Sequence, residues 1–211
     1  MPIYRLSDDL IFPPVEGAED GIVAVGGDLL PERLMIAYHS GIFPWFSEEE
    51  PIIWWSPDPR FVLFPDRLHI SKSMRRVLNN EELKVTFNED FEGVLAQCKT
   101  VPRQGQEGTW ITDEMQLAYI RLYELGHAKS VEVWRGDELV GGMYGVDLGT
   151  VFCGESMFSK ESNASKLALI RFIQKFQKNG GKLFDCQVHS EHLVSLGAEE
   201  IDRKEFLTYL H

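Results

Sequence analysis

Hydrophobic periodicity makes residues 60–211 regular and predicts a mixture of strands and helices there. Alternation of apolar and polar residues predicts five strands, at residues 81–87, 130–134, 138–144, 150–158 and 182–187. Apolar residues at helical spacing predict helices at residues 71–79, 91–98, 112–125, 163–179, 192–196 and 203–210. The three middle strands follow one another with short turns, so they predict an antiparallel meander within an α/β (α+β) fold.

The first 59 residues have a different pattern, which is broken by prolines and glycines. One helix is predicted at residues 31–40, because Pro31 suits a first helical turn and Gly41 suits a C-terminal stop. Three of the five tryptophans follow within residues 45–55, again among prolines. We therefore predict a small, irregular N-terminal domain over residues 1–59 and a catalytic domain over residues 60–211. Some of these rings could simply pack one domain on the other.

Residues 141–159 form a predicted hairpin with four interior glycines, more than an ordinary hairpin needs. Interior glycine in a strand usually marks a bulge or the close approach of a ligand or another backbone. One acid, Glu155, lies within the second apolar run, and buried acids usually have a partner or a function. We expect this hairpin to form one wall of a binding site, where Glu155 binds an ammonium group or pairs with an arginine.

A second polar pair, Asp185 and Gln187, lies in the last predicted strand. Alternation along an ideal strand places both side chains on the face that also carries Leu183. An acid and an amide on one face could grip a single substrate group, the acid taking a proton or a cation and the amide holding a carbonyl. A polar strand end explains the pair equally well.

The net charge of −12 weighs against non-specific binding of nucleic acid, but it does not describe every part of the chain. Residues 60–76 contain one acid and five basic side chains, namely Arg60, Arg67, Lys72, Arg75 and Arg76. A basic island on an acidic body can guide one polyanion to one place. A solvated helix face is the alternative.

Several classes of chemistry lack their sequence signatures. The cysteines Cys98, Cys153 and Cys186 are far apart and odd in number, so we expect neither a disulfide framework nor a zinc site, and reducing cytoplasm is the simplest setting. The histidines show no metal-ligand spacing, and we interpret His189 and His192 as surface or capping residues. We expect no membrane span, no signal peptide, no metal and no nucleotide cradle.

The order of elements is also that of acetyltransferase-like (GNAT-like) domains, although order alone does not fix function. Such domains hold the coenzyme A pyrophosphate on a glycine-rich turn that follows the meander. The corresponding turn here, residues 158–166, contains no glycine. Its backbone cannot form the same close cradle, so we expect a different donor and no cofactor.

Ten blocks of this sequence resemble the bacterial leucyl/phenylalanyl-tRNA–protein transferases, in that family's order from residue 24 to residue 198. They include Ala24-Val-Gly-Gly-Asp-Leu29, Gly41-Ile-Phe-Pro-Trp-Phe46, Trp54-Trp-Ser-Pro-Asp-Pro-Arg60, Gly108-Thr-Trp-Ile-Thr112, Phe152-Cys-Gly-Glu-Ser-Met-Phe-Ser159 and Asp185-Cys-Gln187. The blocks span nearly the whole chain, which makes chance agreement a poor explanation. The resemblance implies an acetyltransferase-like catalytic domain behind a small N-terminal domain.

The resemblance also implies an activity. Such an enzyme takes Leu, Phe or Met from aminoacyl-tRNA and joins it to proteins that begin with Arg or Lys, which marks them for N-end-rule degradation. The implied catalytic residues are Asp185 and Gln187, with Glu155 nearby. The implied substrate-binding residues are Trp45, Trp110, Met143, Phe152, Met157, Phe172 and Phe184. The implied binding residues for the tRNA acceptor stem are Lys72, Arg75 and Arg76.

Two geometric expectations accompany this resemblance. Ideal alternation puts Phe152 and Met157 on opposite faces of their strand, so both can line one pocket only if a bulge intervenes, which we predict at Gly154. A mechanism in which Asp185 attracts the acceptor amine or relays its proton while Gln187 orients it depends on their shared face. A coenzyme A N-acyltransferase and a non-catalytic RNA-binding adaptor are the alternatives to this enzyme.

Overall fold

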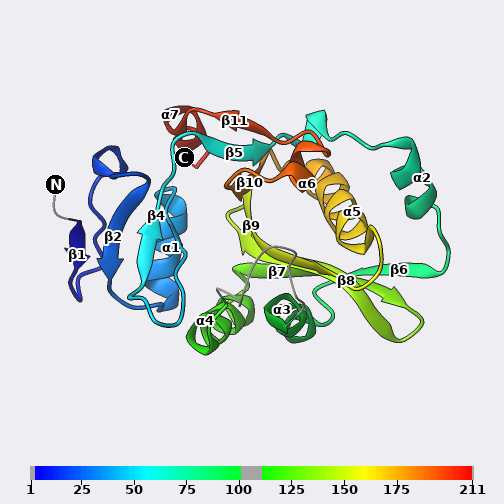
Figure 1. Ribbon diagram of the computed structural model, residues 1–211, viewed down its shortest axis with the longest axis horizontal. Helices are drawn as coiled ribbons and strands as arrows, with labels where there is room; N and C mark the ends of the chain where they lie inside the picture. The colour runs from blue at the N-terminus through cyan, green and yellow to red at the C-terminus, as the bar shows by residue number, and fades with distance from the viewer. Residues whose placement is uncertain (1–2, 101–110, 211) are drawn as a thin grey trace.

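The computed structural model describes residues 3–100 and 111–210 as two β-sheets with helices packed around them (Figure 1). The larger sheet has seven strands in the order β11-β5-β10-β9-β8-β7-β6. Their bounds are β5 Arg60–Leu63, β6 Leu83–Phe87, β7 Ala128–Arg135, β8 Glu138–Asp147, β9 Val151–Ser159, β10 Leu183–Gln187 and β11 Glu199–Ile201. Because β7, β8 and β9 form a continuous antiparallel meander, the fold class predicted from the sequence is confirmed.

The strands β9 and β10 share only a short ladder. They pair in parallel over three residues, from Leu183 opposite Val151 to Asp185 opposite Cys153. β9 then continues to Ser159, whereas β10 is held on its other edge by the antiparallel strand β5. The two strands therefore part after Cys153, and this parting positions the site described below.

Helices cover both faces of the larger sheet (Figure 1). α3 (Phe91–Thr100) and α4 (Asp113–Glu124) lie on one face, and α5 (Ala164–Lys178) lies on the other. Thr112 caps α4 by accepting a hydrogen bond from the Met115 amide, as its place in the sequence predicted. One apolar cluster lies between α5 and the sheet, and a second joins α3 and α4 to the N-terminal residues.

The N-terminal residues form a small sheet that the sequence did not reveal. Its strands, in spatial order, are β1 (Tyr4–Leu6), β2 (Ile22–Gly26), β4 (Ile53–Trp55) and β3 (Phe43–Pro44). They are two to five residues long, which is too short for periodicity to identify. The helix predicted in this region is present as α1 (Pro31–His39). The division at residue 59 stays a prediction, because one apolar cluster runs through both parts.

The remaining elements are short. They are the 3₁₀ helices Val15–Gly17 and Pro65–Arg67, α2 (Lys72–Leu78), α6 (Glu191–Val194) and α7 (Arg203–Leu207). The sequence predicted α2, α6 and α7 but missed β5 and β11. β5 is buried along its whole length, so it shows no alternation, and β11 has only three residues.

Candidate functional site

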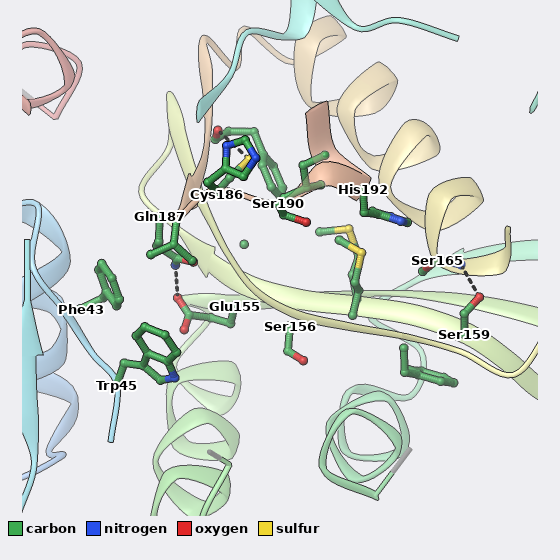
Figure 2. Close-up of a pocket in the computed structure, with 18 of the residues that line it drawn as sticks. Phe43, Trp45, Glu155, Ser156, Ser159, Ser165, Cys186, Gln187, Ser190 and His192 are labelled. Carbon is green, nitrogen blue, oxygen red and sulfur yellow. Dashed lines mark hydrogen bonds between the residues drawn. The ribbon is translucent and has the colours of Figure 1, made fainter. Parts of the chain in front are cut away.

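A cavity of about 960 Å³ opens where β9 and β10 part (Figure 2). Residues 154–159 of β9 form one wall, residues 186–190 form the opposite wall, and residues 43–45 of the N-terminal part close one end. Three segments that are remote in the sequence therefore meet here. The predicted site residues among its lining are Trp45, Met143, Glu155, Met157, Phe184 and Gln187.

Glu155 reaches the cavity because β9 carries a bulge. In the ladder with β8, Gly154 and Ser156 each face a residue of β8, and Glu155 is the extra residue between them. A Cβ atom on Gly154 would lie 2.3 Å from the Phe184 ring, so glycine allows this close approach. The bulge that the sequence predicted at Gly154 is therefore confirmed, with the extra residue one position further on.

Two side chains from other elements donate hydrogen bonds to the Glu155 carboxylate. The Tyr119 hydroxyl donates to Oε2 at 2.7 Å, and the Gln187 side-chain amide donates to Oε1 at 3.1 Å. Burial raises the pKa of Glu155 to about 7, although the hydrogen bond from Tyr119 and the nearby Tyr38 hydroxyl oppose the rise. A carboxyl group with a pKa near neutrality can exchange a proton at physiological pH.

Asp185 is fully buried and does not line the cavity. Arg60, from β5, donates to its two carboxylate oxygens through Nε at 2.8 Å and Nη2 at 2.7 Å. The backbone N–H of Gln187 donates to the same carboxylate at 2.9 Å. These three donors, two from Arg60 and one from the Gln187 backbone, hold the Asp185 carboxylate in place.

Asp185 and Gln187 do not point to the same face of β10, so this prediction from the sequence is wrong. The ladder between β10 and β5 shifts register between these two residues, and Gln187 adopts a φ of 63°. This left-handed conformation, unusual for a residue with a side chain, aims the Gln187 amide at the cavity while Asp185 faces the interior. The two residues are connected through the Gln187 backbone instead.

The apolar end of the cavity is lined by Met143, Met157 and Phe184. Phe152 and Phe172 lie one layer behind, with ring centroids 5.6 Å and 6.0 Å from that of Phe184. The five predicted pocket residues therefore share one cluster, three as lining and two as support. The bulge in β9 makes this possible, because it returns Met157 to the side of the strand that carries Phe152.

Trp45 lies beside Glu155 at the other end of the cavity and is 39% exposed (Figure 2). Its ring centroid lies 5.9 Å from that of Trp55, whose indole N–H donates to the Trp45 carbonyl at 2.7 Å. These contacts fix the position of the Trp45 ring and leave part of it exposed, where another aromatic ring could stack on it. The other predicted aromatic, Trp110, lies outside the described residues.

The basic cluster is smaller than the basic island in the sequence. Arg60 is buried against Asp185, and Arg67 pairs with Glu199. Besides Arg67, the exposed members are the three on α2, namely Lys72, Arg75 and Arg76. α2 lies at the end of the molecule opposite the N-terminal sheet (Figure 1).

Sequence reasoning missed two tyrosines of this site. Tyr38, on α1, and Tyr119, on α4, are both buried, and their hydroxyl oxygens lie 2.6 Å apart. The signal that could have indicated them is a tyrosine on the apolar face of a helix, because a buried tyrosine hydroxyl needs a hydrogen-bond partner.

A smaller cavity of about 310 Å³ adjoins the first one beside the N-terminal end of α5. Ser159, Ser165 and His192 line both cavities. Burial, together with the charge of Lys166, lowers the pKa of His192. The interpretation of His192 as a surface or capping residue is therefore incomplete, since its ring forms part of the cavity wall.

Other site chemistries find little support in the described part of the chain. No group of three His, Cys, Asp or Glu side chains within residues 3–100 and 111–210 could hold a metal ion. No helix in those same ranges is long and apolar enough to cross a membrane. Cys153 and Cys186 are free, and burial raises the pKa of both thiols, which disfavours a nucleophilic thiolate.

Two family models match this chain. The model described as Leucyl/phenylalanyl-tRNA protein transferase covers residues 62–211, and the model of that family's N-terminal domain covers residues 27–58. A protein from Flavobacterium johnsoniae named Leucyl/phenylalanyl-tRNA--protein transferase is 59% identical over 99% of both chains. A protein of the same name from Escherichia coli O81 is 56% identical over all of this chain and 91% of its own length.

Similar solved structures include a GCN5-related N-acetyltransferase from Kribbella flavida and L-PGS from Bacillus licheniformis. The first is 12% identical, with a TM-score of 0.38 over 81% of this chain and 60% of its own. The second is 13% identical, with a TM-score of 0.43 over 79% of this chain and 55% of its own. Both TM-scores are below 0.5, so we base no conclusion on these two likenesses.

Proposed function

Because this chain belongs to the leucyl/phenylalanyl-tRNA–protein transferase family, we propose which donors and acceptors its cavity takes and how its residues act. The protein is an aminoacyltransferase that moves an aminoacyl group from tRNA to the N-terminal residue of a protein. Its proposed donors are Leu-, Phe- and Met-tRNA, and its proposed acceptors begin with Arg or Lys. Transfer marks the acceptor for N-end-rule degradation in the cytoplasm, a compartment that suits cysteines outside a disulfide.

The observation that carries this proposal is the meeting of an apolar pocket and a titratable carboxylate in one cavity. Methionine and phenylalanine side chains line one end, while Glu155, Gln187 and Trp45 lie at the other. A volume of about 960 Å³ can accommodate an aminoacyl group and an acceptor residue together. The ester bond of the donor then lies between the two ends, beside Glu155.

The lining of the apolar end supports a choice of several donor side chains. Met143 and Met157 are unbranched and flexible, so they can repack around leucine, phenylalanine or methionine. An apolar pocket distinguishes side chains that differ by one methylene by only about 1–3 kcal/mol. Acceptance of three different apolar donors follows naturally from such a pocket.

In the proposed chemistry, Glu155 accepts the proton that the acceptor must lose. The α-ammonium group of the acceptor gives one proton to the Glu155 carboxylate, and the neutral amine attacks the ester carbonyl. The C–N bond forms, the C–O bond to the tRNA ribose breaks, and a second amine proton leaves with the ribose oxygen. Glu155 then returns its proton to solvent. The Gln187 amide, bound to Glu155 at 3.1 Å, orients the reacting groups.

Asp185 takes a positioning role in this scheme. Its carboxylate binds Arg60 and the Gln187 backbone, and it does not line the cavity. The sequence suggested Asp185 as the group that takes the proton. We assign that role to Glu155 instead, because Glu155 lines the cavity. Trp45 lies beside Glu155 with an exposed ring that suits stacking on the terminal adenosine.

Reversing charge on α2 should weaken the use of tRNA without altering the chemistry. For the double substitution Arg75→Glu with Arg76→Glu, we expect KM for leucyl-tRNA to rise about tenfold at low salt and the difference to shrink as salt is added, because phosphate contacts are electrostatic. Leucyl-adenosine, which lacks the tRNA body, should be used equally well by both proteins. Lys204→Glu, an exposed charge reversal on α7, is the control and should change neither value.

The function is tested by incubating the protein with radiolabelled Leu-tRNA and peptides that differ only in their first residue. Label should pass to peptides that begin with Arg or Lys and should not pass to one whose N-terminus is acetylated. Binding of tRNA without labelled peptide would favour an RNA-binding adaptor. Acylation of the same peptides from acetyl-coenzyme A would favour the coenzyme A enzyme instead.

A further inference from the structure

A chain of hydrogen bonds crosses the interior from the N-terminal part to the cavity. It begins at Tyr38 on α1, whose hydroxyl oxygen lies 2.6 Å from that of Tyr119 on α4. Tyr119 then donates to Glu155 Oε2 at 2.7 Å. Tyr38 is 1% exposed and Tyr119 is fully buried, so little water competes for these bonds.

The direction of this chain follows from the number of protons available. A tyrosine hydroxyl carries one proton and accepts with its lone pairs. Because Tyr119 gives its proton to the Glu155 carboxylate, Tyr38 must be the donor in the bond between the two hydroxyls. All the donors in the chain therefore point toward Glu155, an arrangement that stabilises negative charge on that carboxylate.

We propose that Tyr119, supported by Tyr38, is a positioning residue that fixes the Glu155 carboxylate at the cavity wall and keeps it ready to accept a proton. This inference rests on the proposed role of Glu155. Neither tyrosine lines the cavity, so both act through Glu155 and do not touch the substrate.

The charged groups around Glu155 explain why it needs this support. Burial favours the neutral acid, and the negative charge of Asp185 acts in the same direction. The Arg60 guanidinium favours the carboxylate, but it is already engaged by Asp185. Cys153 and Tyr144 are further titratable groups close to this cluster, and both are buried. The Tyr119 hydroxyl is therefore a strong local influence that holds Glu155 ionised near neutral pH.

The test is the pH dependence of kcat/KM for an Arg-initiated peptide with Leu-tRNA as donor. Tyr119→Phe removes one oxygen, so we expect the acid limb of the profile to move up by about one pH unit, because a hydrogen bond to a charged group is lost. Tyr38→Phe should move the limb in the same direction by less. Tyr123→Phe is the matched control on the same helix: its hydroxyl donates to the Asn88 carbonyl, and its profile should not move.

Both tyrosine variants keep the aromatic ring. If Tyr119→Phe folds poorly, the pH profile of Tyr38→Phe still tests the inference. A purely structural role would lower the melting temperature without moving the limb, and an unmoved limb in both folded variants overturns the inference. The wild type and Glu155→Gln separate this failure from the failure of the proposed function. If those two proteins share one profile, then the role of Glu155 itself is wrong. If they differ while Tyr119→Phe matches the wild type, only the positioning role fails.

Discussion

Replacing Arg60 with alanine should lower the free energy of unfolding by about 3–5 kcal/mol, because it leaves a buried charge without its partner. Asp185 would lose the donors that Arg60 supplies at 2.7 Å and 2.8 Å. The guanidinium would also leave the rings of Phe43 and Phe206, whose centroids lie 4.8 Å and 4.5 Å from its central carbon. Urea unfolding followed by tryptophan fluorescence measures the loss.

A matched control for this prediction lies nearby in the sequence. Arg67 also pairs with a carboxylate, that of Glu199, but its side chain is 59% exposed. Exposed pairs contribute less than about 1 kcal/mol, so Arg67→Ala should change stability little. If Arg60→Ala unfolds no more easily than Arg67→Ala, the buried pair does not anchor this part of the fold.

A double substitution separates the contribution of Arg60 to stability from its contribution to activity. Arg60→Met with Asp185→Leu removes both charges together, so much of the lost stability should return. Transfer activity should stay low, because the Gln187 backbone N–H loses the carboxylate that accepts from it at 2.9 Å. Activity that returns together with stability would contradict the positioning role of Asp185.

The second large effect is expected at Glu155. Glu155→Gln should slow the transfer step by about 10²–10⁴-fold, the usual contribution of a proton-transferring side chain. Glutamine has nearly the same size and can still accept from Tyr119, but it cannot take a proton from the acceptor. Single-turnover transfer from Leu-tRNA to an Arg-initiated peptide measures this rate, and tRNA affinity should stay unchanged.

Glu138→Gln is the control for that substitution. Glu138 is an exposed acid at the start of β8, in the same meander but outside the cavity. The Glu138→Gln enzyme should transfer leucine at the wild-type rate. A Glu155→Gln enzyme that keeps the full rate would show that proton transfer takes place elsewhere.

The parts of this account that the sequence predicted depend on local signals. The meander is visible as three alternating segments with short turns, and the bulge is visible because Phe152 and Met157 cannot otherwise share a side of one strand. The apolar pocket and the importance of Glu155 followed from the same hairpin and from the family resemblance. The strands and the bulge are each indicated by a few neighbouring residues, whereas the resemblance rests on blocks from residue 24 to residue 198.

What the sequence could not provide depends on pairs that are remote along the chain. Arg60 lies 125 residues from Asp185, and Tyr38 lies 81 residues from Tyr119. No local pattern distinguishes an arginine that binds a buried acid from one that faces solvent, which is why Arg60 was counted in a basic island. The direction of the Gln187 side chain could not be predicted either, because it depends on the left-handed backbone conformation of this one residue at the end of β10.

The most direct test of the proton transfer is the pH profile of kcat/KM for the Arg-initiated peptide, corrected for spontaneous hydrolysis of the donor ester. The wild type should give a bell: activity rises as Glu155 ionises near pH 7 and falls as the acceptor amine loses its proton, at about pH 8. The activity of Glu155→Gln should instead rise as the acceptor amine loses its proton and then stay level, because only the neutral amine can react. The same bell in both enzymes would contradict the account.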